Sequence, residues 1–220
     1  ENAINNINLN SIDKLFFLKN RYTGNVNGTL NISKKESELF ILTDLVANNF
    51  RFDKLEYSNI FLLGSFKNNK ILIKELSGYE NSSFFNISGF IETNRNLNFS
   101  NNNAVDLKGS VTDFDISKLN RYIPWAINIG GEITSDISIS GKLNSIKLNM
   151  DPVIVNPRFD KVYGDKIVGK ISYKNNRLYL SNVNFKTNQG NYNVNGSLPA
   201  NLNYFNTEKI NLKPIYIDIN

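Results

Sequence analysis

Apolar and polar residues alternate along much of this chain. In residues 26–32, valine, leucine and isoleucine fall on one face, while asparagine and threonine fall on the other. Residues 192–198 follow the same period of two, which is typical of β-strands with one apolar face and one face in water. Asparagine-rich runs at 67–69, 174–176 and 188–190 separate such segments and predict turns.

The pattern repeats along the chain with an offset of 107 residues. Without a gap, Ser65–Lys70 corresponds to Ser172–Arg177, and Asn86–Gly89 corresponds to Asn193–Gly196. Internal repeats of this kind indicate that one structural unit occurs more than once. The sequence therefore predicts two equivalent β units in tandem.

A third unit begins near the end of the chain. There Leu212-Lys213 is similar to Leu107-Lys108, with an offset of 105 residues. We therefore divide the chain into unit 1 at 1–107, unit 2 at 108–209 and the start of a third unit at 210–220. We expect the chain to be a piece of a longer array.

One short helix is expected in each unit. Around residues 117–123 the apolar positions Ile116, Leu119, Tyr122 and Ile123 recur at helical spacing, and Pro124 ends the run. The corresponding segment of the first unit follows Ser11, which can cap a helix, and carries Ile12, Leu15 and Phe16. We expect each helix to close one end of the apolar layer, with contact to a membrane as the alternative.

Composition excludes several kinds of chemistry. The chain has no His and no Cys, so it lacks imidazole bases, thiol nucleophiles and the usual zinc ligands. Its acidic residues mostly stand singly beside Lys or Arg on polar strand faces. We expect no enzymatic activity, no catalytic residue, no cofactor and no metal site.

The net charge of +5 does not by itself indicate nucleic-acid binding. The 25 Lys and Arg residues are scattered among 20 Asp and Glu residues, and the one dense basic run is Ser33-Lys34-Lys35. The sequence contains no aromatic-and-basic signature of an RNA-binding module. We expect no nucleic-acid partner.

Several ordered motifs resemble the TamB and AsmA-like family. Gly130–Leu143 is similar to the family's Gly-flanked pair of amphipathic strands, and Leu107–Ile116 is similar to its strand that leads into a short helix. Asp165–Pro199 resembles its strand series ending in Leu-Pro. The first unit departs from the pattern, because Gly89–Glu92 lacks the Leu-Pro ending and Ser33–Lys35 lacks a glycine.

The resemblance implies an all-β fold: an elongated U-shaped sheet, called a β-taco or repeating β-groove, with an apolar interior and one short helix per repeat. It also implies a place in the cell envelope, crossing the periplasm of a Gram-negative (diderm) bacterium, with the full-length protein anchored in the inner membrane. Family members meet an outer-membrane barrel-assembly protein, and they take part in phospholipid passage and outer-membrane protein assembly. The anchor and the partner-binding end are expected outside this chain.

The alternation and the resemblance together predict which residues line the groove and contact phospholipid or unfolded outer-membrane protein. The predicted lining residues are Val26, Leu30, Ile32, Phe85, Ile87, Ile133, Ile137, Ile139, Ile171, Tyr192, Val194 and Leu198. The residues predicted to point to solvent are Asp136, Ser138, Asn193 and Asn195.

Two other interpretations stay open. The asparagine-rich repeats also suit the stalk of a surface adhesin or autotransporter, although a parallel β-helix repeats every twenty-odd residues and this unit is far longer. A carbohydrate-binding β-sandwich would need exposed aromatic residues beside paired acids, and Trp125 is the only tryptophan. The alternation does not decide whether the apolar interior is open or packed solid.

Overall fold

The computed structural model is nearly all β, which confirms the predicted fold class. It describes residues 2–9, 22–35, 38–52, 55–95, 97–120, 128–199 and 216–219. In the structure the chain divides into two compact units whose limits differ slightly from those of the sequence repeat: unit 1 is Glu1–Ser100 and unit 2 is Asn101–Asn220. Across the described ranges, no helix has the length and apolar character needed to cross a membrane.

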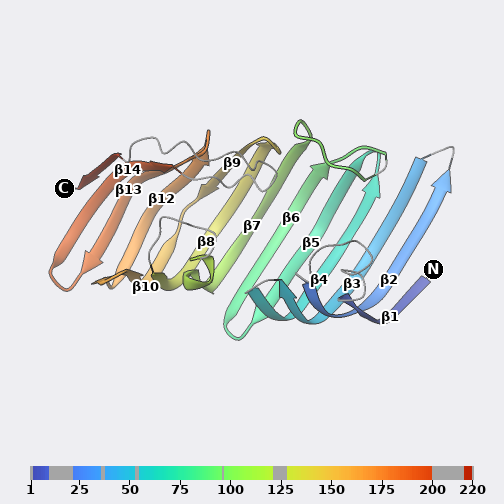
Figure 1. The fold of residues 1–220 in the computed structure, drawn as a ribbon, viewed down its shortest axis with the longest axis horizontal. Coiled ribbons are helices and arrows are strands. Elements are labelled where there is room, and N and C mark those ends of the chain that lie inside the picture. The colour runs from blue at the N-terminus through green and yellow to red at the C-terminus, as the bar shows by residue number, and fades with distance from the viewer. Residues whose placement is uncertain are drawn as a thin grey trace. The chain divides into compact units, whose positions relative to one another are not determined.

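The described part of unit 1 is a sheet of six antiparallel strands, in which each strand pairs with the next along the chain (Figure 1). The two residues between β4 and β5, Asn68 and Asn69, both have positive φ (51° and 58°), as a tight hairpin turn requires. The predicted turn is confirmed. The strands are β1 (Asn2–Asn8), β2 (Tyr22–Lys35), β3 (Glu38–Phe52), β4 (Leu55–Lys67), β5 (Lys70–Glu80) and β6 (Ser83–Glu92).

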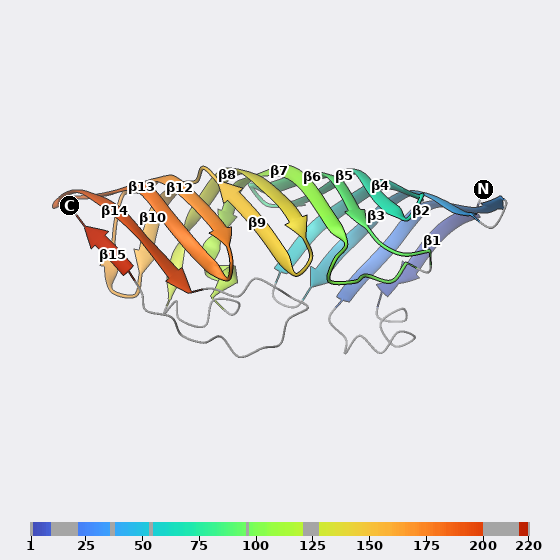
Figure 2. The same ribbon diagram turned by 90° about the horizontal axis from the view of Figure 1, so that it is seen from above.

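Unit 2 is also an antiparallel sheet. Strand β8 pairs with both β9 and β10, these two pair with β12, and the sheet continues through β13 and β14 to β15 (Figure 2). Its elements are β7 (Ala104–Asp115), η1 (Ile116–Leu119), β8 (Ile129–Lys142), β9 (Ser145–Met150), β10 (Val153–Phe159), β11 (Val162–Tyr163), β12 (Lys166–Lys174), β13 (Arg177–Thr187), β14 (Gly190–Pro199) and β15 (Tyr216–Ile219).

The 107-residue offset is visible in the strand boundaries. Strand β2 at 22–35 corresponds to β8 at 129–142, and β5 at 70–80 corresponds to β13 at 177–187, each shifted by 107. The boundary between the compact units falls between Ser100 and Asn101, whereas the boundary predicted from the repeat, between 107 and 108, falls within β7. The starting point of a repeat is arbitrary in the sequence, and in the structure all of β7 belongs to unit 2.

Irregularities of the ladder repeat at the same offset. The register shift between Ile4 and Ile7 in β1 recurs between Val111 and Phe114 in β7. A β-bulge adds one residue to a strand, so apolar side chains three positions apart lie on the same face. The shift between Ile73 and Leu76 likewise recurs between Leu180 and Val183.

The units differ where a proline interrupts a strand. Strand β3 is continuous over its 15 residues, whereas its counterpart in unit 2 is split into β9 and β10 at Asp151 and Pro152. Proline has no N–H to donate to a ladder. The corresponding residue of unit 1, Leu45, pairs with both neighbouring strands.

In its described part, the predicted helix of unit 2 is a short 3₁₀ helix. A 3₁₀ turn covers Ile116–Leu119, and the Ser117 N–H donates to the Asp115 carboxylate at 2.9 Å. The Asn120 amide then exchanges two hydrogen bonds with the backbone of Ile129, at 2.8 and 3.0 Å, which ties the turn to β8 after four residues. The predicted positions beyond 120, including Trp125, and the segment 12–16 lie outside the described residues.

Candidate functional site: an apolar sheet face in each unit

The register of unit 1 collects its apolar residues on one face. Side chains that are directly opposite in an antiparallel ladder lie on the same face, so the pairings can be followed from strand to strand. Thr43 is the polar side chain in the middle of this face, and near the strand ends the register adds Lys34, Glu80 and Ser83. The apolar face of unit 1 comprises Ile4, Ile7, Val26, Gly28, Leu30, Ile32, Ile41, Thr43, Leu45, Ala47, Ile60, Leu62, Gly64, Phe66, Ile71, Ile73, Leu76, Gly78, Phe85, Ile87, Gly89 and Ile91.

Unit 2 has an equivalent face with no charged side chain in its described members. Ser135 and the tyrosine hydroxyl groups are its polar groups. The apolar face of unit 2 comprises Val105, Leu107, Gly109, Val111, Phe114, Ile133, Ser135, Ile137, Ile139, Gly141, Ile146, Leu148, Met150, Ile154, Ile167, Ile171, Tyr173, Leu178, Leu180, Val183, Phe185, Tyr192, Val194, Gly196, Leu198, Ile217 and Ile219.

All twelve predicted lining residues lie on these two faces, five in unit 1 and seven in unit 2. Their exposure varies, from the buried Ile133 to Ile32, which is 56% exposed near a strand end. Asp136, Ser138, Asn193 and Asn195 lie on the opposite face, as predicted. On this face the Asn195 amide donates to the Asn193 side-chain oxygen at 2.8 Å.

The apolar face of unit 1 is poorly covered. Among its described hydrophobic residues, Ala47 and Phe66 are buried, at 8% and 5% exposure, and the others are half-buried or exposed. In a two-layer sandwich the facing sheets interdigitate, and such residues are shielded from water. The described part of unit 1 therefore presents apolar area that a solid β-sandwich would have covered.

The apolar face of unit 2 is more closely packed. Tyr173 is 1% exposed, and Val105, Val111, Ile154 and Val183 are all buried. The Tyr173 hydroxyl donates to the Asn176 side-chain oxygen at 3.0 Å, which satisfies its polar end. This part of the face resembles an ordinary core.

One end of that face opens into a cavity of about 610 Å³, within the range of small-molecule sites. The Lys161 ammonium is the one charged group among the described residues of its wall. The cavity can therefore accept an apolar chain with an anionic end. Its apolar and aromatic lining residues are Val162, Tyr163, Phe185, Tyr192, Val194 and Ile219.

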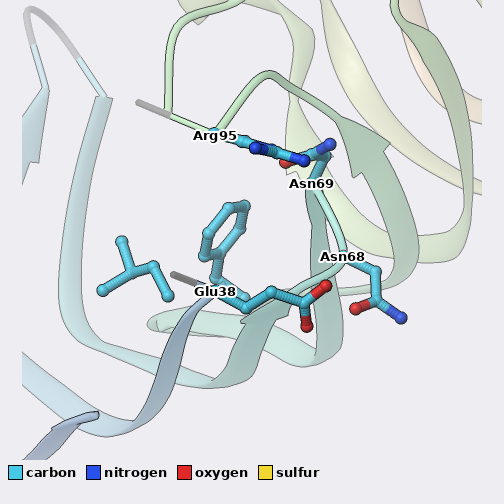
Figure 3. Close-up of a pocket in the computed structure, with 6 residues that line it drawn as sticks. Glu38, Asn68, Asn69 and Arg95 are labelled. Atoms are coloured by element: carbon cyan, nitrogen blue, oxygen red, sulfur yellow. The ribbon is translucent and has the colours of Figure 1, made fainter. Parts of the chain in front are cut away.

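A smaller pocket of about 180 Å³ lies in unit 1, where the apolar face ends. Leu39 and Phe66 form its apolar wall, and Glu38 and Arg95 supply opposite charges. Figure 3 shows Glu38 near Asn68 on one side of the pocket and Arg95 near Asn69 on the other. The pocket is too small for an acyl chain, so it only forms the polar edge of the apolar face of unit 1.

Equivalent space beside the apolar face is filled by aromatic residues at different positions in the two units. In unit 1, Tyr57 meets the Phe85 ring edge to face at 5.0 Å, and a Cβ at Gly78 would overlap Phe85. At the positions 107 residues later, tyrosine becomes Gly164 and glycine becomes Phe185. A Cβ at Gly164 would overlap the Phe185 ring, so each unit fills this space from a different strand.

Tyr57 carries the one clearly shifted pKa among the described residues. Burial of its hydroxyl and the nearby Glu80 carboxylate raise the pKa of Tyr57 from 10.0 to about 12. Both causes disfavour the phenolate. Tyr57 therefore stays neutral at the end of the apolar face.

The described side chains of the two faces offer mainly apolar contact. Within the described residues, no three His, Cys, Asp or Glu side chains gather into a metal site. No family model, curated protein or solved structure matches this chain. The resemblance to TamB and AsmA-like proteins therefore rests on the sequence motifs alone.

Sequence reasoning missed the bulges, the pockets and the different placement of aromatic residues in the two units. The different placement could have been found by comparing Tyr57 with Gly164 and Gly78 with Phe185 across the repeat. The pockets had no sequence signal, because they depend on strand ends that meet only in the folded sheet.

Proposed function

We propose that this chain is a non-enzymatic segment of a TamB/AsmA-like envelope protein whose apolar sheet faces hold the acyl chains of phospholipids. One observation carries the proposal: unit 1 keeps an almost uninterrupted apolar face half-exposed, with only Ala47 and Phe66 buried among its described hydrophobic residues. Such a face gains free energy when hydrocarbon covers it, at about 25 cal/mol per Å².

The described middle of each face carries no charged side chain, and Lys34 and Glu80 lie near strand ends of unit 1, which also suits a moving cargo. A buried unpaired charge costs several kcal/mol, and it would hold or block a sliding acyl chain. Thr43 and Ser135 are small, and their hydroxyl groups add only a modest barrier. Acyl chains can therefore slide along each face without being trapped at a strong polar site.

The second cargo of this function is unfolded outer-membrane protein. Its strands alternate apolar and polar residues, so one side of such a strand can rest on the same apolar face. We propose an envelope location in a diderm bacterium, with the inner-membrane anchor and the outer-membrane barrel-assembly partner belonging to other parts of a longer protein.

The stalk interpretation has less support. Each strand pair that the structure describes is antiparallel, as in the β2–β3, β5–β6 and β13–β14 ladders, whereas a parallel β-helix stalk stacks parallel strands. A stalk also gains nothing from an exposed apolar face, because exposed apolar area promotes aggregation.

Native mass spectrometry of the chain, purified from a Gram-negative envelope, tests the proposal. We expect co-purifying phospholipid and less of it with Val194→Asp or Leu30→Asp, which place a carboxylate on each apolar face. The matched controls Asn193→Asp and Asn31→Asp add the same charge on the opposite face. Circular dichroism must show that each variant keeps its β content.

Two results would contradict the proposal. One is a wild-type chain that carries no lipid after gentle purification. The other is a pair of inward Asp variants that stay folded and carry as much lipid as their controls. Recovery of outer-membrane protein instead of lipid, with the same dependence on the inward positions, would assign the second cargo.

A further inference from the structure

The face of unit 2 opposite its apolar face carries a cluster of cations. Register places six of them on that face of β9, β12 and β13. The described strands β9, β12, β13 and β14 contain no Asp or Glu. The cluster, called the basic face below, consists of Lys147, Lys166, Lys170, Lys174, Arg177 and Lys186.

Like charges stand directly opposite one another in this cluster. Lys166 pairs with Lys186, and Lys174 pairs with Arg177, across the β12–β13 ladder. Direct cross-strand pairs of like charge destabilise a sheet. The ion pairs that the structure describes, Arg51–Glu56 at 3.3 Å and Lys70–Glu92 at 3.4 Å, are both in unit 1.

We propose that the basic face binds the anionic, phosphate-bearing surface of a membrane. Lysine dominates the cluster, and its flexible point charge suits phosphates that move in a fluid surface, whereas fixed phosphates favour the arginine fork. The four lysines of β12 and β13 are exposed, so their ammonium groups can reach a surface beyond the sheet.

Two tyrosines on the same face support a membrane partner. The Lys174 ammonium lies 5.2 Å from the centre of the Tyr179 ring, and the Arg177 guanidinium lies 5.9 Å from that of Tyr216. Amphipathic aromatic rings beside cations favour the headgroup region of a bilayer. Ser172, Tyr179 and Ser197 form one cross-strand row, so this row between the cations is polar.

Nucleic acid fits this face less well. Single-stranded nucleic acid is held by bases stacked on open aromatic rings, and Tyr179 and Tyr216 already lie under cations. The remaining side chains between the cations are mostly serine and asparagine, including Ser181, Asn184 and Asn193. Such a surface attracts phosphate, and both of its described rings already have a cation beside them.

This inference does not depend on the proposed function, because it concerns the opposite side of the sheet. Flotation of the 220-residue chain with vesicles of phosphatidylcholine plus about one third phosphatidylglycerol tests it. We expect binding to these vesicles and none to pure phosphatidylcholine. Added salt should weaken the binding, because it screens exposed charges.

The double variant Lys166→Gln/Lys186→Gln is the decisive test. Each basic residue near an anionic membrane contributes enough that losing two should weaken binding about 30-fold. Its thermal midpoint should equal or exceed that of the wild type, because the cross-strand repulsion is gone. A loss of binding therefore cannot be ascribed to unfolding.

The matched control is Lys108→Gln/Lys142→Gln. It removes the same charge from the same face of β7 and β8, where Asp106 and Asp136 balance the lysines. We expect it to change vesicle binding less than about threefold. Equal losses in the two double variants would overturn the proposal, because net charge alone would then explain binding.

Two further outcomes would also overturn it. One is equal binding to neutral and anionic vesicles. The other is tighter binding to a single-stranded oligonucleotide than to the anionic vesicles at the same salt concentration, which would assign the basic face to nucleic acid.

Discussion

Units 1 and 2 share a strand plan but differ on the face opposite their apolar faces. At positions 107 residues apart, Leu63 of unit 1 corresponds to Lys170 and Tyr79 corresponds to Lys186. Leu63 and Tyr79 are 40% and 46% exposed, and the Tyr79 ring lies 6.2 Å from Phe61. One unit therefore exposes apolar side chains where the other exposes ammonium groups.

The strand plan tolerates this difference between the two units. The strand boundaries of β5 and β13 agree at the 107-residue offset although Tyr79 has become Lys186. The strand plan is thus kept when a side chain on the opposite face changes from aromatic to charged. The opposite face is free to vary, and it is where the two units can acquire different partners.

The apolar faces differ less, and mainly in packing. Phe66 and Tyr173 occupy equivalent positions, and both are buried, at 5% and 1% exposure. Around them unit 2 buries Val105, Val111 and Val183, whereas the described hydrophobic residues on the apolar face of unit 1 are otherwise half-buried or exposed, apart from Ala47. Unit 2 therefore depends more on a packed core.

The largest expected effect is the loss of the most buried ring. Tyr173→Ala should lower the free energy of unfolding by about 3–5 kcal/mol, because it leaves a large cavity. Tyr173→Phe, which copies Phe66, should cost only about 1 kcal/mol for its hydrogen bond to Asn176. Urea unfolding followed by circular dichroism measures both. Similar losses in the two variants would mean that the hydroxyl group, and not the ring, holds unit 2.

The different placement of aromatic residues predicts a coupled pair in unit 1. Gly78→Phe alone should cost about 1–3 kcal/mol of unfolding free energy through overpacking against Phe85. Adding Tyr57→Gly, which copies the arrangement of Gly164 and Phe185, should recover part of that loss. A double-mutant cycle in urea measures the coupling, expected at about 0.5–3 kcal/mol. Strict additivity would show that the two positions do not share one space.

Tyr57 predicts a pH effect that is confined to unit 1, where its counterpart in unit 2 is Gly164. Its pKa is 10.0 when unfolded and about 12 when folded. The free energy of unfolding therefore carries no penalty from Tyr57 below pH 10 and falls between pH 10 and pH 12, because the unfolded chain releases the tyrosine proton first. Tyrosinate absorbance should show a late-titrating group that Tyr57→Phe removes. If that variant left the titration unchanged, the assignment would be wrong.

The smallest effect on stability is expected from a substitution on the face of unit 1 opposite its apolar face. Leu63→Lys, which copies Lys170, should change the unfolding free energy by no more than about 0.5 kcal/mol. It should also reduce self-association at high concentration, because it divides an exposed apolar patch. Sedimentation velocity and urea unfolding measure the two properties. A large loss of stability would show that Leu63 is part of a core in unit 1.

Much of this molecule could be predicted from local pattern. The period of two around Val26 and Val194 indicated strands and the face of each, because side chains alternate along any extended chain. The repeat offset could be read because equivalent positions keep their apolar character. The turn at Asn68 and Asn69 was evident because asparagine tolerates positive φ.

Other features depend on which strands become neighbours, and local pattern does not contain that information. The Lys166–Lys186 pair exists only in the β12–β13 register. The hydrogen bonds between Asn120 and Ile129 likewise depend on where the 3₁₀ turn lies beside β8. Bulges such as that between Ile73 and Leu76 keep apolar residues on one face where strict alternation would turn them away. Alternation is a property of a single strand, whereas packing, charge clusters and pockets belong to the ladder as a whole.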